Sequence, residues 1–203
     1  MPDVRLPVLP TLAAGVDVFT DAEGKKRAGG ALPTGHLGFA VTHPTRGKAH
    51  GVGTVPVAFV RLLDDIRLRD TYIGQFELVA ALTPFLSLPR EWFEGRPVTL
   101  WIDNSSAIGS LIKGYSGKPD CARIVNMFHF VFAQLGAASL YIDYVPTESN
   151  PADIPSRFHE MSYDERRAAA DDLGTLVPMV VPSFVHDDGS WLSYTEIARS
   201  IWG

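Results

Sequence analysis

The sequence predicts an α/β protein in which helices cover one mixed β-sheet. Near the N-terminus, runs of alternating β-branched and aromatic residues indicate strands, and later segments have helical periodicity. A nearly continuous apolar run, VTLWIDN at residues 98–104, is typical of a central strand that is covered on both faces. The resulting order is strand meander, helix, strand, helices, strand and helix, which is characteristic of the α/β class.

The first half of the chain is expected to form an antiparallel meander and a helix. VDVFTDA (16–22) alternates, and GHLGFAVTH (35–43) and GTVPVAFV (53–60) follow as two more strands, separated by Gly and Pro. Over residues 70–88, apolar residues recur at helical spacing. Pro84 is expected to kink this helix or to end it early.

The second half is expected to complete the sheet. After the strand at 98–104, we expect helices over 105–114 and 119–135, a strand over 139–145, and a helix that begins at Asp153. The whole arrangement is a five-stranded mixed sheet that is flanked by helices.

Length and composition suit one domain with an appendage. The chain has 203 residues, of which 46% are hydrophobic and 20% are charged. We expect a Pro-containing connector over residues 1–15, which follows an upstream part of a larger polyprotein, a main domain over 16–158 and a C-terminal extension of unknown role over 159–203. In the extension, Ser162 with Glu165 and Ser193 with Glu196 fit capping boxes, so short helices are expected there.

Charge and cysteine content narrow the function classes. The formal net charge of −5 argues against a protein that coats nucleic acid, although it permits a local basic groove. Cys121 is the only cysteine, so there is no internal disulfide and no thiolate zinc site. No stretch approaches the roughly 20 apolar residues of a membrane helix, and the start lacks a signal-peptide pattern. We therefore expect an intracellular protein, in the cytoplasm or the nucleus, with no membrane partner.

Four acidic residues occupy comparable places in these elements. Asp21 lies near the end of the first strand, Glu77 in the first helix, Asp103 at the end of the fourth strand, and Asp153 just after the fifth. In an open sheet, groups at the ends of adjacent central strands converge in one crevice. Asp21 and Asp103 are therefore neighbours if the first and fourth strands pair side by side.

A cluster of carboxylates favours a particular chemistry. The like charges repel one another and desolvation adds to the cost, so a cation is expected among them. Oxygen ligands alone favour Mg²⁺ or Mn²⁺ over zinc. Two such ions about 4 Å apart clamp the attacking water and the leaving oxygen in phosphodiester hydrolysis.

Four segments resemble the motifs of the ribonuclease H family in the form carried by retroelement reverse transcriptases. They are FTDAEG, QFELVAA, LWIDNSSAIGSLIKGYSGKPD and YVPTESNPADIPSR, in the family's order, and they span about residues 16–158. The last motif, with its NPAD and SR, is especially similar to those of long-terminal-repeat and tyrosine-recombinase retrotransposons. The resemblance implies a ribonuclease H-like fold and cleavage of the RNA strand of RNA/DNA hybrids.

The resemblance also implies roles for individual residues. It assigns two Mg²⁺ ions, with Mn²⁺ possible, to four catalytic acids, and it implies a reverse transcriptase polymerase domain upstream as a partner. Among substrate contacts, the amide of Gln75 is placed to reach the 2′-hydroxyl of RNA. The catalytic and metal-binding residues are Asp21, Glu77, Asp103 and Asp153, and the substrate-binding residues are Gln75, Asn104, Lys113, Lys118 and Arg123.

The sequence departs from the family pattern in two places. Many cellular members have a histidine in the loop before the last acid, where this chain offers Glu148 instead. Only GYSGKP separates the two middle helices, so the long basic segment by which some members hold the hybrid is missing. Affinity for the hybrid is therefore expected to depend on the polymerase domain.

Each acid also has a purely structural interpretation. Asp21 before Gly24 fits turn chemistry, Asp103 lies in a helix N-cap region, and Asp153 suits the first turn of a helix. Glu77 is the most informative acid, because a carboxylate on an apolar helix face costs stability unless it is paired or metal-bound.

Two other functions remain open. A 3′–5′ exonuclease of similar fold is suggested by Asp21-Ala22-Glu23, although no Tyr or His lies four or five residues before Asp153. A catalytically inactive ribonuclease H-like scaffold is the other alternative, although such modules usually lose acids that this chain retains. Transposase-like nucleases usually end on a glutamate, so the terminal aspartate argues against them.

Overall fold

The structure is a computed structural model that describes residues 13–197. Most of the expected connector over residues 1–15 lies outside the described residues. Within them, no helix is long and apolar enough to cross a membrane.

The described chain forms a six-stranded mixed sheet with the order β5-β4-β1-β2-β3-β6. The expected five-stranded mixed sheet with flanking helices is confirmed, and the C-terminal extension adds a sixth strand of two residues. β1, β2 and β3 form the expected antiparallel meander. The other pairs are parallel: β4 pairs with β1, β5 pairs with β4, and β6 pairs with β3. The strands are β1 (Val16–Lys25), β2 (Thr34–His43), β3 (Gly47–Thr54), β4 (Pro97–Ile102), β5 (Ser139–Tyr144) and β6 (Thr175–Leu176).

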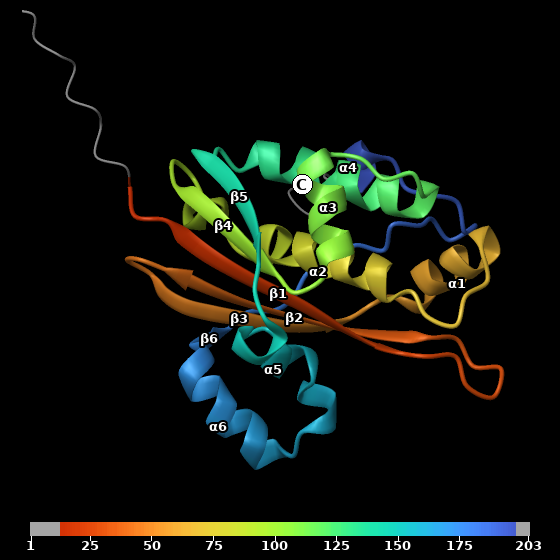
Figure 1. Cartoon of the computed structure of the whole chain (residues 1–203), viewed down its shortest axis with the longest axis horizontal. Helices are drawn as coiled ribbons and strands as arrows, with labels where there is room; N and C mark the ends of the chain where they lie inside the picture. Colours follow the sequence, from red (N-terminus) through yellow and green to blue (C-terminus); the bar gives the residue numbers. More distant parts are fainter. Residues whose placement is uncertain (1–12, 198–203) are drawn as a thin grey trace, which may run out of the picture.

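Helices cover both faces of the sheet, as Figure 1 shows. One face carries α1 (Val57–Ile66), α2 (Ile73–Ser87), α3 (Ser105–Lys113) and α4 (Pro119–Gln134). The opposite face carries the short α5 (Asp153–Ser156) and α6 (Tyr163–Leu173). Three 3₁₀ turns complete the order, namely η1 (Arg90–Trp92), η2 (Thr147–Ser149) and η3 (Phe158–Glu160).

The prediction of a strand over residues 53–60 is wrong. The third strand is Gly47–Thr54, and residues 57–66 form α1, whose Pro56 lies at the N-cap. The apolar side chains Phe59, Val60 and Leu63 are also at helical spacing, and they are buried on one helix face. The actual strand is rich in glycine and lacks a clear alternation, so its pairing with β2 rather than its own composition makes it a strand.

Helix α2 is the central helix and is buried almost all around, from residue 75 to residue 86. Pro84 does not end it, and the helix continues to Ser87. A proline at this position cannot donate a hydrogen bond to the carbonyl of Ala80. The Thr83 hydroxyl donates to that carbonyl instead, over 2.9 Å, which satisfies the group that the proline leaves unpaired.

The pairing of β1 with β4 creates the crevice expected from the sequence. The two strands run parallel, and their register ends at Thr20 opposite Ile102. β1 continues to Lys25, whereas β4 has ended. The sheet therefore opens beyond this pair, next to Asp21 and Asp103.

The C-terminal extension packs into the same hydrophobic core as the preceding residues. Phe184 and Ile197 are buried there, and Phe184 lies 4.6 Å from Phe59 of α1 between ring centroids. The capping box at Ser162 is present and begins α6. The hydrogen bonds of the second box join Ser193 and Glu196, and the chain is helical from residue 194 to the last described residue. The division between a domain at 16–158 and an extension at 159–203 stays a prediction.

Candidate active site

Three of the four expected acids meet at the opening between β1 and β4. One carboxylate oxygen from each of Asp21, Glu77 and Asp103 lies within 4.8 Å of the others. Asp21 and Asp103 each come directly after the last residue pair that joins β1 to β4. Glu77 reaches the same place from α2, which packs against β1. Asp153 does not belong to this group in the described part of the chain.

Burial makes this group of charges costly. Asp21 and Glu77 are 5% and 4% exposed, which is rare for carboxylates. The pKa of Asp21 is raised to about 6, chiefly by burial and to a smaller extent by the charges of Asp103 and Asp153, while the hydrogen bond from Ser156 opposes this rise. Burial, followed by the charges of Asp21 and Asp103, raises the pKa of Glu77 well above its ordinary value, and the backbone N–H of Ala22 offsets this in part.

The residues present fit a hard divalent cation. Glu77 Oε2 is fully buried and has no hydrogen-bond partner within the described residues. A buried acceptor without a donor costs free energy, which a cation among the three carboxylates would remove. All the converging ligand atoms are oxygens, the type that Mg²⁺ and Mn²⁺ prefer.

Asp153 lies at the edge of the cluster, at the start of α5. Its Oδ1 is 2.9 Å from Arg157 Nη2, one helical turn later. Its charge is near enough to raise the pKa of Asp21. Asp153 therefore contributes to the field of the site, and an ion pair with Arg157 occupies its side chain.

The position of α5 depends on a glycine in the neighbouring strand. Gly38 of β2 lies opposite Asp21, and a Cβ atom there would be 2.4 Å from Ser156 N and 2.6 Å from Ala152 O. Glycine thus allows the backbone of α5 to lie directly on the sheet. From this position the Ser156 hydroxyl donates a hydrogen bond to Asp21 Oδ2.

The loop that leads to α5 is fixed by Asn150. Its buried amide nitrogen donates to the Thr20 carbonyl over 3.0 Å, and its oxygen accepts from Ala152 N over 3.1 Å. These bonds tie the NPAD segment to β1 one residue before Asp21.

Asp103 and Asn104 are adjacent but have different roles: Asn104 caps α3, and Asp103 belongs to the acid cluster. Asn104 Oδ1 caps α3 by accepting from Ser106 N at 3.0 Å and Ala107 N at 3.1 Å. Asp103 is therefore not the cap residue, and its Oδ2 accepts a hydrogen bond from Thr147 Oγ1 over 2.8 Å. The capping interpretation applies to Asn104, while Asp103 remains in the acid cluster.

Gln75 is buried on α2, two residues before Glu77. Its Nε2 donates to Asp120 Oδ2 over 2.6 Å, and Arg69 Nη1 lies 3.2 Å from the same oxygen. Gln75 also lines a hollow of about 580 Å³ between the start of α2, α3 and α4. Its role as a substrate contact stays a prediction.

Two of the three basic candidates, Lys113 and Lys118, line hollows on this side. Lys118 lines the larger one together with Arg67, Arg69 and Ser106, and Ser106 is in the first turn of α3. Lys113 lines an adjacent hollow of about 280 Å³ with Tyr115. Arg123 is placed differently, because its guanidinium lies over the Trp191 ring at 4.9 Å from the centroid. Arg123 thus packs on the C-terminal extension.

Sequence reasoning did not identify Ser156, Thr147, Asn150 and Gly38 as parts of the site. Ser156, Thr147 and Asn150 lie within the quoted last motif, so proximity to Asp153 was the available signal. Gly38 had no local signal, because its importance comes from the backbone that packs on it.

Comparisons with known proteins give similarity at the level of structure. No protein-family model matches the sequence, and no curated protein matches it significantly. Ribonuclease H1 from the halophilic archaeon Halobacterium salinarum is 17% identical, with a TM-score of 0.48, over 78% of this chain and 99% of that chain. The N-terminal ribonuclease H domain of Rv2228c from Mycobacterium tuberculosis, solved as a fusion with maltose-binding protein, is 14% identical, with a TM-score of 0.37, over 79% of this chain and 100% of that chain. Because these values are low, the functional assignment depends on the residues of the site.

Proposed function

We propose that this chain is a metal-dependent ribonuclease H that cuts the RNA strand of RNA/DNA hybrids. The observation that carries the proposal is the convergence of Asp21, Glu77 and Asp103 at the open end of β4, with an unpaired buried oxygen on Glu77. A purely structural cluster of this kind would be costly, because two of the three carboxylates are buried.

Two Mg²⁺ ions, or Mn²⁺ in their place, are the proposed cofactors. Asp21, Glu77 and Asp103 would hold them, with Asp153 as the fourth acid at the edge. When bound, such ions activate a water for attack on the phosphodiester and stabilise the charge on the departing 3′ oxygen. The protein's contribution is to orient the acids: Ser156 fixes Asp21, and Thr147 fixes Asp103.

The proposed path of the substrate follows the hollows next to the acids. Ser106 lies in the first turn of α3, three residues after Asp103, and it lines the larger hollow. Arg67, Arg69 and Lys118 line the same hollow. These cations suit a phosphate backbone, although Asp120 neutralises part of the charge of Arg69. Lys113 extends the basic surface, and Asn104 and Gln75 are proposed to contact the substrate closer to the acids.

A retroelement reverse transcriptase is the proposed parent protein. The support is the YVPTESNPADIPSR motif, which contains Asp153 and also supplies Asn150 and Ser156 to the site. The overall charge of −5 gives little non-specific attraction to nucleic acid. An upstream polymerase domain is therefore the proposed source of most of the affinity for the hybrid.

The test is cleavage of a labelled RNA/DNA hybrid, compared with single-stranded RNA, duplex DNA and single-stranded DNA. Each substrate is incubated with Mg²⁺, with Mn²⁺ and with chelator, using the parent protein and Asp103→Asn. Asp143→Asn is the matched control, because Asp143 lies on β5 and is not one of the converging acids. We expect internal cuts in the RNA of the hybrid only, lost with chelator and in Asp103→Asn but retained in the control.

Other outcomes point to the alternatives. Stepwise loss from 3′ ends would indicate the exonuclease. Hybrid binding without cleavage, also after addition of the polymerase domain, would indicate a scaffold. Full activity in Asp103→Asn would contradict the assigned site.

A further inference from the structure

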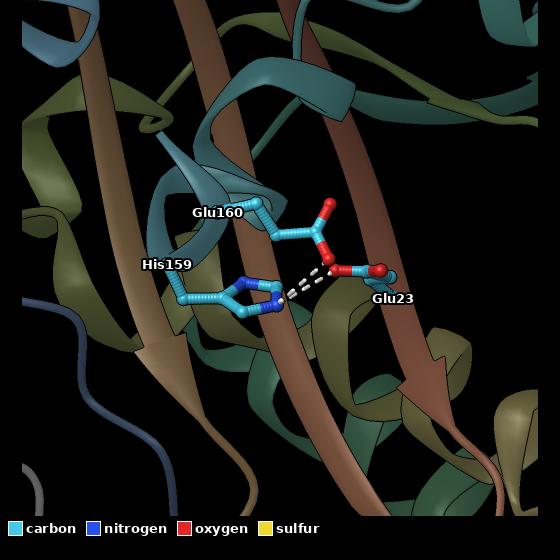
Figure 2. Close-up of side chains that lie close together, drawn as sticks. All are labelled: Glu23, His159 and Glu160. Carbon is cyan, nitrogen blue, oxygen red and sulfur yellow. Dashed lines mark ion pairs between the residues drawn. The ribbon is translucent and has the colours of Figure 1, made fainter. Parts of the chain in front are cut away.

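A second cluster of potential metal ligands lies on the same strand, outside the proposed active site. Glu23 of β1 meets His159 and Glu160 of η3, and one ligand atom from each lies within 4.8 Å of the others. Figure 2 shows both carboxylates directed toward the same nitrogen of the imidazole ring. This group combines two oxygens with one nitrogen, whereas the acid cluster has oxygens alone.

The distances in this cluster suit a shared ion. His159 Nε2 is 3.1 Å from Glu23 Oε2 and 3.7 Å from Glu160 Oε1. Two ligands that each lie about 2.1 Å from one tetrahedral ion are about 3.4 Å apart. The two observed separations lie on either side of this value.

Hydrogen bonding does not explain the convergence. Glu23 Oε2 and both ring nitrogens of His159 are shielded from solvent, yet none has a hydrogen bond of normal geometry within the described residues. A buried oxygen and a buried nitrogen that approach closely without a hydrogen bond suit a third atom between them. Lys25 Nζ is 3.4 Å from Glu160 Oε1, but its side chain is half exposed.

The surroundings support the ring and leave a path to it. The His36 ring stacks on His159, with centroids 3.5 Å apart and planes at 6°, which fixes the orientation of the imidazole. His159 also lines a cavity of about 880 Å³ between β3, η3 and α6. A metal site requires an entry path, and this cavity is the place from which an ion would reach the histidine.

We propose that Glu23, His159 and Glu160 form a binding site for one divalent ion of the Zn²⁺ type, separate from the proposed catalytic ions. An imidazole nitrogen favours Zn²⁺ and related metals over Mg²⁺. The bound ion would join β1, two residues beyond Asp21, to η3, which directly follows the α5 segment that holds Asp153 and Ser156. This site does not depend on the proposed nuclease function.

The experiment is calorimetric titration of the metal-free chain with Zn²⁺ in excess Mg²⁺ at neutral pH. We expect one equivalent of Zn²⁺ to bind, and its affinity to fall at least about 10-fold in His159→Gln and in Glu23→Gln. His186→Gln is the matched control, because His186 lies 3.5 Å from the carboxylate of Glu196 and outside the three-ligand cluster. Asp103→Asn should retain the Zn²⁺ equivalent, which separates this site from the acid cluster.

Two results would overturn the proposal. One is the absence of Zn²⁺ binding by the parent chain in excess Mg²⁺, which would leave the contacts of His159 with Glu23 and Glu160 without an ion between them. The other is unchanged binding in both His159→Gln and Glu23→Gln. Circular dichroism of each variant confirms folding, and Glu160→Gln replaces either variant that does not fold.

Discussion

Two clusters of titratable groups lie along one strand, and they differ in burial and in donor atoms. Asp21 belongs to a group of carboxylates, two of them buried, that come from β1, α2 and the end of β4. Glu23, two residues further along the same face, meets an imidazole and a half-exposed carboxylate from η3. The first group consists of carboxylates alone, whereas the second includes an imidazole nitrogen. The first set of donor atoms suits a hard divalent ion, while the second suits a softer metal.

The largest expected effect separates the clusters by activity. Glu77→Gln keeps the shape of the side chain but removes a charge and a ligand oxygen, so cleavage of hybrid should fall at least about 1,000-fold, which corresponds to about 4 kcal/mol. Initial rates in Mg²⁺ measure this change. Glu91→Gln, on the exposed turn η1, is the control. Activity within a few-fold of the parent would remove Glu77 from the site.

The next effect concerns pH. The folded chain holds a proton on Asp21 more tightly than the unfolded chain, because the pKa rises from 3.8 to about 6. This contribution to the stability of the metal-free protein is complete below the unfolded pKa and is lost as pH rises through the folded value, up to about 3 kcal/mol. Glu77 acts in the same direction.

Denaturant unfolding in chelator, between about pH 4 and pH 8, measures this loss. Asp21→Asn should be more stable than the parent at the upper end and should show a flatter profile. If the difference in the free energy of unfolding between the parent and Asp21→Asn were the same at every pH, the raised pKa would be contradicted.

A smaller effect is expected where α5 meets the sheet. Gly38→Ala places a Cβ against backbone atoms of α5, which cannot move aside as a flexible side chain can. We expect a loss of about 2 kcal/mol in the free energy of unfolding and a fall in activity, because Ser156 and Asp153 shift together. Gly74→Ala, with open space around the added Cβ, is the control for chemical unfolding. Equal stability of the two variants would show that α5 does not lie on Gly38.

The smallest effect is expected from the hydroxyl that orients Asp21. Ser156→Ala removes the hydrogen bond to Asp21 Oδ2, so activity should fall about 10-fold while folding is retained. Because this bond lowers the pKa of Asp21, the acidic limb of the pH–rate profile should move to higher pH. Steady-state rates across pH measure both changes. An unchanged profile would mean that the hydroxyl does not act on Asp21.

Sequence reasoning was most successful where local pattern and topology agree. The meander follows from periodicity. The sequence made Asp21 and Asp103 neighbours on the condition that the first and fourth strands pair, and the structure shows that β1 and β4 do pair, in parallel. Reasoning was wrong for residues 53–60, because VPVAFV fits both a strand and a helix, and Gly-rich β3 has little strand signal of its own.

The remaining details depend on contacts between distant segments. The distance of Asp153 from the other acids is set by the contact of α5 with Gly38 and by Arg157, neither of which has a sequence signature. Likewise, the pairing of Glu23 with His159 joins a strand to a 3₁₀ turn far along the chain. Periodicity describes single elements, so it cannot give such distances.

The way the last segment rejoins the core has a consequence for biosynthesis. From η3 the chain runs along one face of the sheet, adds β6 to its edge and returns to the helical layer, where Phe184 and Ile197 are buried. A ribosome that has released only the residues up to 158 exposes a core that lacks these side chains. The core therefore packs completely only after residue 197 has left the exit tunnel. All four acids have left the tunnel by then, so we expect their positions to become fixed after their synthesis rather than during it.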